Sequence, residues 1–318
     1  MVGTRLGRGA NFKCLISDDS IPSKYIRDEA TSGALSKRLI AIVAEGDRGR
    51  IYIQPSKNDE NLLNQTWPAW SPELKVTTPC HDVDRLPMYG MPMWGDAFSS
   101  RQLVAMNAFS NLITSAIEKC ANDSIRYSYQ KDETSLEAGG VGTRAYAEAI
   151  GVYLRLALDT VADRCTTVCI WDSTRDNIRN TFGRQAIAMV WDYAESNVLG
   201  SSSGSFDNAV EQGVKVLEQS LSAATLSIAV QHDAQSQSIS FNKVVSTDPP
   251  YYDNIGYAEL AAFFYVWLRH NLHGIFPKLY LTICVPKADE LIASIYRPGN
   301  RQAGDGCCLN GVTGAMKS

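Results

Sequence analysis

The stretch VVSTDPPYYDN, residues 244–254, sets the expected architecture of this chain. Its leading valines belong to an apolar run, residues 241–247, that predicts a β-strand. Two consecutive prolines then fix φ and hold the residue before each of them in an extended conformation, so the strand should end at Asp248. Residues 257–270 follow with the apolar pattern of a buried helix. Strand, rigid loop and helix in this order are typical of a site at the carboxyl end of a parallel sheet.

The tetrapeptide Asp248-Pro249-Pro250-Tyr251 resembles the catalytic tetrapeptide of amino-methyltransferases that use S-adenosyl-L-methionine. An exocyclic amine such as adenine N6 is a poor nucleophile, because its lone pair is delocalised into the ring. The Asp248 carboxylate and the Pro249 carbonyl, held by Pro250, can accept its two N–H bonds and favour a pyramidal nitrogen. Tyr251 offers a flat face to an extruded base, a contact worth about 1–3 kcal/mol. A proline-stiffened turn is the competing interpretation, and the tetrapeptide alone does not separate DNA from RNA substrates.

Length and composition describe an ordinary globular chain. With 318 residues it can hold one large or two modest domains, and 45% of its residues are hydrophobic. A net charge of −4 argues against a wholly basic nucleic-acid coat but is compatible with a local basic groove. The eight cysteines form no C-x-x-C pair and the histidines number four, so we expect no metal site. Because no signal peptide and no membrane-spanning run is found, we expect a reduced, cytoplasmic protein.

Hydrophobic periodicity predicts a mainly helical first two thirds and a mixed last third. The expected helices cover residues 22–46, 100–121, 143–164, 184–191, 207–222 and 257–270. The expected strands cover residues 50–54, 226–230, 241–247 and 278–285. In the helix over residues 143–164, the expected inward positions are Ala145, Ala149, Val152, Leu156 and Val161.

Runs from nearly the whole chain look familiar together. They are residues 7–15 (GRGANFKCL), 44–50 (AEGDRGR), 94–98 with 101–103 (WGDAF and RQL), 171–176 (WDSTRD), 189–195 (MVWDYAE) and 246–268. They resemble the large prokaryotic DNA methylases usually described as adenine-specific and containing a zinc ribbon. The resemblance implies an α/β fold, in which a partial Rossmann-like methyltransferase sheet carries a large, mainly helical insertion. It also implies S-adenosyl-L-methionine as cofactor and DNA as substrate.

The chain departs from that family in two ways. Family members are longer, and their Asp-Pro-Phe-x-Gly-x-Gly cofactor loop and zinc ribbon lie upstream of the matching segment; neither motif is found here. In addition, Cys307-Cys308 stands where an aromatic pair is usual, and the sequence ends at Ser318 within an expected helix. These departures indicate an internal or truncated piece. Residues 1–200 would be the helical insertion, a target-recognition region, and residues 201–318 the catalytic half of the methyltransferase domain, incomplete at its C-terminus.

Two further sets of side chains are candidates for the site. Asp233 ends the strand expected before the catalytic strand, where methyltransferase folds often place an acidic residue that accepts a hydrogen bond from the cofactor adenine; a solvated turn aspartate is equally consistent. Arg175, Arg179 and Arg184 can contact nucleic-acid phosphates, because arginine binds such oxygens in bidentate geometry. A solvated or salt-bridged surface is the competing interpretation. No glycine run follows a strand as a cofactor loop requires.

Three hypotheses therefore remain open. In the first, the chain is the base-binding and catalytic half of a DNA adenine-N6 methyltransferase, and the Asp at the first position of its tetrapeptide favours adenine over cytosine N4. In the second, it is a catalytically inactive fragment that binds nucleic acid or a protein partner, such as the upstream methyltransferase segment or a restriction or defence-system protein. In the third, it belongs to an RNA amino-methyltransferase.

Overall fold

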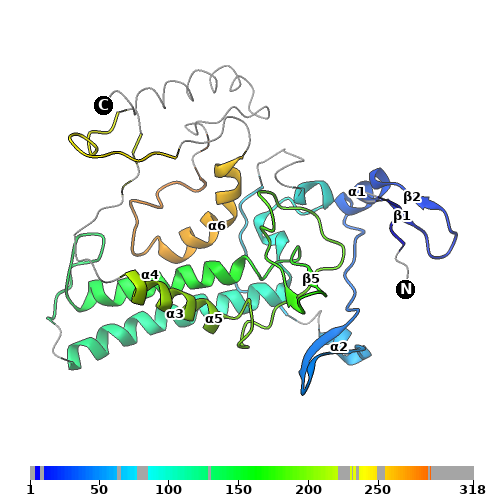
Figure 1. Cartoon of the computed structure of the whole chain (residues 1–318), viewed down its shortest axis with the longest axis horizontal. Helices are drawn as coiled ribbons and strands as arrows, with labels where there is room; N and C mark the ends of the chain where they lie inside the picture. The colour runs from blue at the N-terminus through cyan, green and yellow to red at the C-terminus, as the bar shows by residue number, and fades with distance from the viewer. Residues whose placement is uncertain are drawn as a thin grey trace.

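The computed structural model describes residues 4–7, 11–62, 66–76, 85–127, 130–220, 230, 232–233, 236–248, 255–285 and 287. The elements follow the order β1 (Phe12–Lys13), β2 (Ser20–Ile21), α1 (Ser23–Thr31), β3 (Ile42–Gly46), β4 (Gly49–Ile53), α2 (Lys57–Leu62), η1 (Leu86–Tyr89), η2 (Trp94–Ala97), α3 (Ser100–Arg126), α4 (Thr143–Ala162), β5 (Trp171–Asp172), β6 (Asn177–Ile178), α5 (Phe206–Ser220) and α6 (Tyr257–Leu272). These elements form a helical body with small antiparallel hairpins at one end (Figure 1).

Helices α3 and α4 are the longest elements and run antiparallel along each other (Figure 1). Helix α3 begins where the sequence predicts, because Ser99 and Gln102 form a capping box. The Ser99 Oγ accepts from the Gln102 N–H at 3.3 Å, and the Gln102 Oε1 accepts from the Ser99 N–H at 2.7 Å. Where the helices meet, a Cβ on Gly151 of α4 would lie 2.3 Å from the Cδ1 atom of Ile117. A residue without a side chain therefore allows the close approach.

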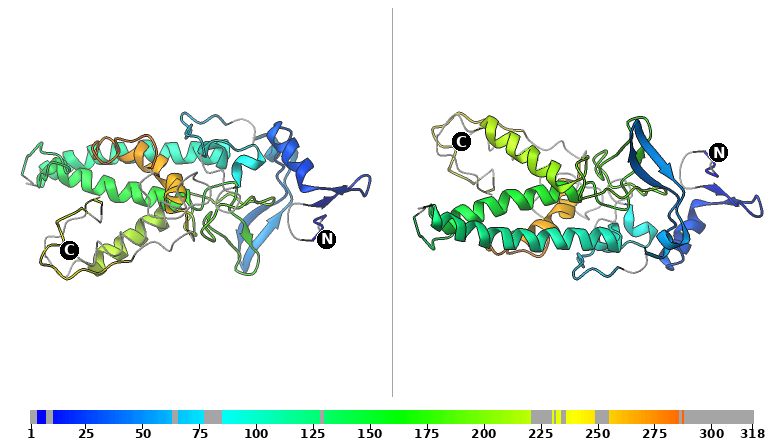
Figure 2. Two further views of the ribbon diagram at one scale, coloured as in Figure 1. Left: turned by 90° about the horizontal axis from the view of Figure 1, so that it is seen from above. Right: turned by 90° about the horizontal axis from the view of Figure 1, so that it is seen from below.

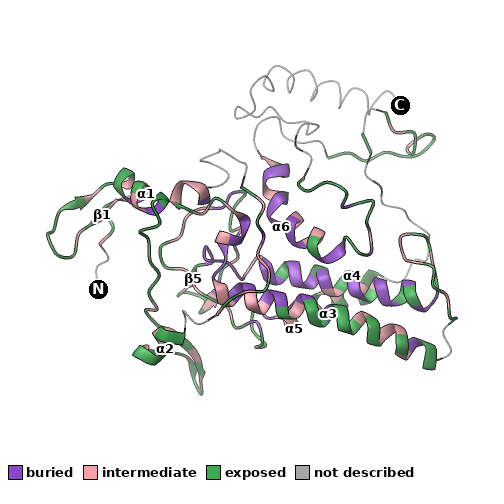
Figure 3. Cartoon of the chain, turned by 180° about the vertical axis from the view of Figure 1, so that it is seen from behind, coloured by how far each residue is buried: buried purple, intermediate pink, exposed green. Residues whose placement is uncertain are grey.

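Helix α6 lies over α4 and supplies the centre of the hydrophobic core (Figures 1 and 3). Its Phe263 and Trp267 side chains are fully buried. Phe98, just before α3, stacks on Phe263 with ring centroids 5.8 Å apart, and Phe182 approaches the same ring edge-on at 5.3 Å. The same cluster includes Ala209 of α5, so the core crosses residue 200. The predicted division into residues 1–200 and 201–318 stays a prediction.

The β3–β4 hairpin stands apart from this core. Its strands pair from Ile42 opposite Ile53 to Gly46 opposite Gly49, which leaves Asp47-Arg48 as a two-residue turn. Figure 2 shows this hairpin at the same end of the molecule as the N-terminus, away from the far ends of α3 and α4. An isolated two-stranded hairpin is marginally stable in water, so the contacts that it makes with neighbouring segments matter.

The structure corrects two of the expected strands. Residues 241–247 and 278–285 contain turns and irregular backbone but no strand, and the side chain of Val244 is fully exposed. An extended apolar run becomes a strand only where another strand offers its N–H and C=O groups, and no such neighbour is present among the described residues. The described part also contains no parallel pair. The strand expected over residues 226–230 lies outside the described residues, except for Val230.

Of the expected helices, one is shorter than predicted and one is absent from the described structure. Within residues 22–46, α1 ends at Thr31 and Gly33 adopts φ +82°, after which Ile42–Gly46 forms β3. Cross-strand pairing of β-branched residues outweighs the helical spacing counted along this segment. Residues 184–191 are not helical, because their backbone bonds to other segments: the Ile187 carbonyl accepts from the Arg85 N–H at 3.1 Å. The strand predicted at residues 50–54 is confirmed as β4.

The four remaining helix predictions are confirmed within a few residues, as α3, α4, α5 and α6. On α4, Ala145 and Val161 are buried as expected, and Ala149 and Val152 are half-buried. Leu156 is 44% exposed, so its expected inward position is wrong. The polar residues Arg155 and Asp159 are buried instead, and Arg155 lies beside Thr114 of α3.

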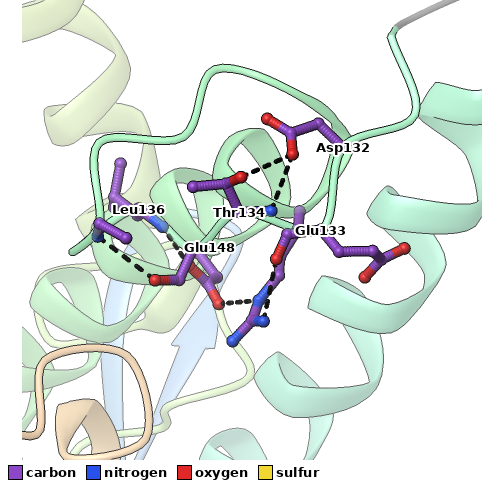
Figure 4. Close-up of polar contacts among 8 residues, drawn as sticks. Asp132, Glu133, Thr134, Leu136 and Glu148 are labelled. Carbon is purple, nitrogen blue, oxygen red and sulfur yellow. Dashed lines mark hydrogen bonds and ion pairs between the residues drawn. The ribbon is translucent and has the colours of Figure 1, made fainter.

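A buried glutamate ties the loop between α3 and α4 to the body (Figure 4). Glu148 of α4 accepts from the Leu136 N–H at 2.6 Å and from the Arg144 guanidinium at 2.9 Å. Arg144 also donates to the Glu133 carbonyl at 3.1 Å, and Asp132 accepts from Thr134 in the same loop. Both carboxylate oxygens of Glu148 are therefore used, and the loop is fixed against the first two turns of α4.

Candidate functional site

The predicted catalytic tetrapeptide lies only partly within the described residues. Asp248 is exposed and follows an irregular segment, while Pro249, Pro250 and Tyr251 lie outside the described part of the chain. Within that part, no hydrogen bond or ion pair joins Asp248 to Arg175, Arg179 or Arg184. The predicted roles of the four tetrapeptide residues therefore stay predictions.

Helix α6, which starts at Tyr257 after the tetrapeptide, is firmly anchored. Helix α6 begins after Gly256 and carries Phe263 and Trp267 into the core. Near its C-terminal end, the ring of His270 stacks on Trp70 with centroids 3.8 Å apart, and Trp70 packs edge-on against Trp267. Burial of these aromatic surfaces holds the helix in one position. Any loop that leads into α6 at residue 256 thus ends on a rigid support.

Polar side chains lie behind α6, where it faces α3 and α4. The Ser110 hydroxyl donates to the Asn271 Oδ1 at 2.6 Å, and the Arg155 Nη2 lies 3.5 Å from the Thr114 Oγ1. The Arg155 Nε, the Asp159 Oδ1 and the Asn271 Nδ2 are buried without a hydrogen-bond partner. An unsatisfied buried polar group costs about 1–3 kcal/mol, so this layer is a local weakness of the helix packing.

Burial in this layer shifts the ionisation of its side chains. It raises the pKa of Asp159 well above the ordinary aspartate value, because the charged form is desolvated. Burial also lowers the pKa of His270, and the positive charge of Arg155 lowers it further. The pKa of Tyr280 is raised by burial and then by the nearby Asp159. Since His270 favours the neutral form and stacks on Trp70, its chemistry fits a packing role better than proton transfer.

The predicted cofactor-binding residue, Asp233, and the glycine-rich run both make contacts within their own loops. Asp233 is exposed, and its carboxylate accepts from the Ser236 hydroxyl at 3.1 Å within its own turn. In the glycine-rich run of the α3–α4 loop, a Cβ on Gly140 would lie 2.2 Å from the Thr134 carbonyl, and one on Gly142 would lie 2.3 Å from the Asp132 Cβ. These glycines allow the loop to pack on itself. They do not present a backbone cradle to a ligand.

The three candidate arginines follow one another on an exposed surface. Arg175 lies in the turn of the β5–β6 hairpin, Arg179 follows β6 and Arg184 lies in the next loop. The Arg179 Nη1 forms an ion pair with the Asp172 Oδ2 at 3.4 Å, whereas Arg175 and Arg184 make no ion pair with any other described residue. The structure thus leaves two of the three predicted nucleic-acid contacts with unpaired guanidinium groups.

Sequence patterns did not reveal a second charged cluster beside these hairpins. Arg101, in the first turn of α3, pairs with Glu195 through two contacts, Nε–Oε2 at 3.1 Å and Nη2–Oε1 at 2.6 Å. The Lys37 ammonium lies 5.8 Å from the centre of the Tyr193 ring. Burial of that ammonium lowers the pKa of Lys37, and Glu195 opposes the shift. Arg101 and Glu195 are 94 residues apart, so no local spacing could have predicted their pairing.

The described residues contain no recognisable metal site or membrane span, and known proteins give no match to the chain. Among the described residues, no group of three or more His, Cys, Asp and Glu side chains could hold a metal ion, and no helix is long and apolar enough to cross a membrane. Comparisons of the chain with protein-family models, with curated proteins and with solved structures found no match. The resemblance to DNA methylases therefore rests on the sequence runs alone.

Proposed function

We propose that this chain is part of an S-adenosyl-L-methionine-dependent amino-methyltransferase that acts on adenine N6 in DNA. The tetrapeptide Asp248-Pro249-Pro250-Tyr251 would form the pocket for the base amine. The observation that carries the proposal is the join between this tetrapeptide and the anchored α6, which starts six residues after Tyr251 at Tyr257. A rigid support next to the loop is what precise positioning of an acceptor amine requires.

The chain's own residues would act on the acceptor base. The Asp248 carboxylate and the Pro249 carbonyl would accept the two amine N–H bonds, and Tyr251 would stack on the extruded adenine. Arg175 and Arg184, which form no ion pair within the described part of the chain, would contact phosphates near the extruded base. A further methyltransferase segment, or a restriction or defence-system partner, would contribute to the cofactor site.

A second candidate is a module that binds nucleic acid without catalysis. It is favoured by the irregular backbone at residues 241–247 and 278–285, where a methyltransferase sheet would need strands. In that case the tetrapeptide would be a turn, and the arginines alone would carry the function. RNA methylation is the third candidate, and it differs from the first only in the substrate that binds.

Base extrusion tests the proposal without requiring a cofactor site. A duplex carrying 2-aminopurine at successive positions should gain fluorescence with the 318-residue chain, because an extruded base is unstacked. Tyr251→Ala should reduce that gain, while Tyr127→Ala, at the end of α3, should not. Methyl transfer from labelled S-adenosyl-L-methionine, lost in Asp248→Ala, would favour the enzyme. Duplex binding without extrusion would instead favour the module, and extrusion from RNA alone would favour the third candidate.

A further inference from the structure

We propose that the β3–β4 and β5–β6 hairpins together form a surface that binds duplex DNA, with Arg48 and Arg175 as its contacts to the nucleic acid. The proposal rests on the proposed function for the class of partner. It goes further in assigning the binding to a ribbon, β3–β4, that no sequence pattern marked as a nucleic-acid contact. It also excludes Arg179, which the sequence alone could not separate from its neighbours.

The two hairpins are locked side by side through Tyr52 of β4. The Trp171 Nε1 donates to the Tyr52 hydroxyl at 2.9 Å, and that hydroxyl donates to the Asp176 Oδ1 at 3.1 Å. The Tyr52 and Trp171 rings also meet edge-on, with centroids 6.4 Å apart. Tyr52 is 119 residues from Trp171, so these contacts bring two distant segments to one surface. Each hairpin turn carries one arginine, Arg48 between β3 and β4 and Arg175 between β5 and β6.

Some of the charged side chains on this surface form ion pairs with each other, and others do not. Glu45 pairs with Arg50 at 3.8 Å, and Asp172 pairs with Arg179 at 3.4 Å. Asp176 accepts from Tyr52, as described above. Arg48 and Arg175 are exposed and make no ion pair or hydrogen bond through their side chains in the described structure. Asp47 lies beside Arg48 and Asp176 beside Arg175, and neither carboxylate forms an ion pair in the described structure. The formal charge of these four groups is therefore zero, so contact with nucleic acid would depend on the two exposed guanidinium groups rather than on a net positive surface.

The dimensions of the ribbon suit the major groove. Five-residue strands such as β3 and β4 extend about 17 Å at a rise of roughly 3.4 Å per residue. The major groove is about 12 Å wide and admits a two-stranded ribbon. The tip can therefore enter while the pair of hairpins stays attached to the body. Guanidinium groups at the two turns would then lie where phosphate or guanine oxygens can accept two hydrogen bonds each.

Binding of a fluorescein-labelled 20-base-pair duplex, measured by anisotropy at several salt concentrations, tests this inference. Each phosphate contact contributes about 0.9 to the slope of log K against log salt, which corresponds to roughly eightfold in affinity at 0.1 M salt. Arg48→Ala and Arg175→Ala should each lower the slope by about 0.9 and the affinity by roughly eightfold. Asp47→Asn should tighten binding. Arg126→Ala, an exposed arginine at the far end of α3, is the matched control and should leave the slope unchanged.

One further variant and the choice of assay distinguish a failure of this inference from a failure of the proposed function. Tyr52→Phe removes the hydroxyl that joins the hairpins and should weaken binding although both arginines remain. The binding assay contains no S-adenosyl-L-methionine and does not read out base extrusion, so a failure of the methylation proposal does not affect this measurement. Wild-type slope in the Arg48→Ala/Arg175→Ala double variant would overturn the inference. Equal loss in the Arg126→Ala control, or preference for single-stranded RNA over the duplex, would overturn it as well.

Discussion

Replacing Asp159 by asparagine should stabilise the protein at neutral and higher pH. Asp159 is 7% exposed on α4, and its Oδ1 has no hydrogen-bond partner. Burial raises its pKa well above the ordinary value, because the folded state disfavours the carboxylate. Asparagine has nearly the same shape and does not ionise, so Asp159→Asn removes the cost of either protonating the side chain or burying its charge.

The sign and size of the effect follow from proton linkage. Below about pH 4, Asp159 is protonated in both the folded and the unfolded state, and its contribution to stability is fully present. As the pH rises toward the raised folded-state pKa, the unfolded state gives up its proton first. The free energy of unfolding of the wild type then falls by up to about 1.4 kcal/mol per pH unit. The advantage of Asp159→Asn should therefore be near zero at pH 4 and grow with pH.

Urea unfolding between pH 4 and pH 8 measures this advantage. A gain of 1.4 kcal/mol would raise Tm by roughly 3–6 °C in a domain of 150–250 residues, and by somewhat less here. Glu148→Gln, also a buried acid on α4, is the matched control of opposite sign. Its carboxylate bonds to Leu136 and Arg144, so its loss should cost about 1–3 kcal/mol at pH 7. The reasoning is refuted if Asp159→Asn is less stable than the wild type at pH 8, or keeps the wild-type pH dependence.

Two further predictions concern local backbone structure. Gly90→Ala should destabilise the fold by about 2 kcal/mol or more, because φ is +74° there and a Cβ would lie 2.2 Å from the Ala30 carbonyl. Gly213→Ala on α5, where a Cβ would meet no atom within 4 Å, should stabilise the fold by roughly 0.5–1 kcal/mol. Equal effects of the two substitutions would contradict the argument. Ser99→Ala should cost about 1 kcal/mol through loss of the α3 cap, whereas Ser100→Ala should stay within about 0.5 kcal/mol; both values come from denaturant titration.

Much of the helical body could be predicted from local sequence. Periodic apolar residues predicted α3, α4, α5 and α6 within a few residues, and the capping box of Ser99 and Gln102 explains why α3 begins where it does. These features act within one or two turns, so the sequence contains their cause. The proline-stiffened tetrapeptide could be located in the same way. Its partners could not, because they depend on where other segments of the chain lie.

The hairpins and the charged surface were decided by tertiary structure. Ile42–Gly46 became a strand because Gly49–Ile53 pairs with it, while residues 241–247 have no such neighbour in the described part and form none. Ion pairing also separates the arginines, since Arg179 pairs with Asp172 whereas Arg175 forms no ion pair in the part of the chain that the structure describes. Helix formation, caps and turns rest on neighbours in sequence, and sequence determined them. Strand pairing, burial and ion pairing rest on neighbours in space, which only the folded chain supplies.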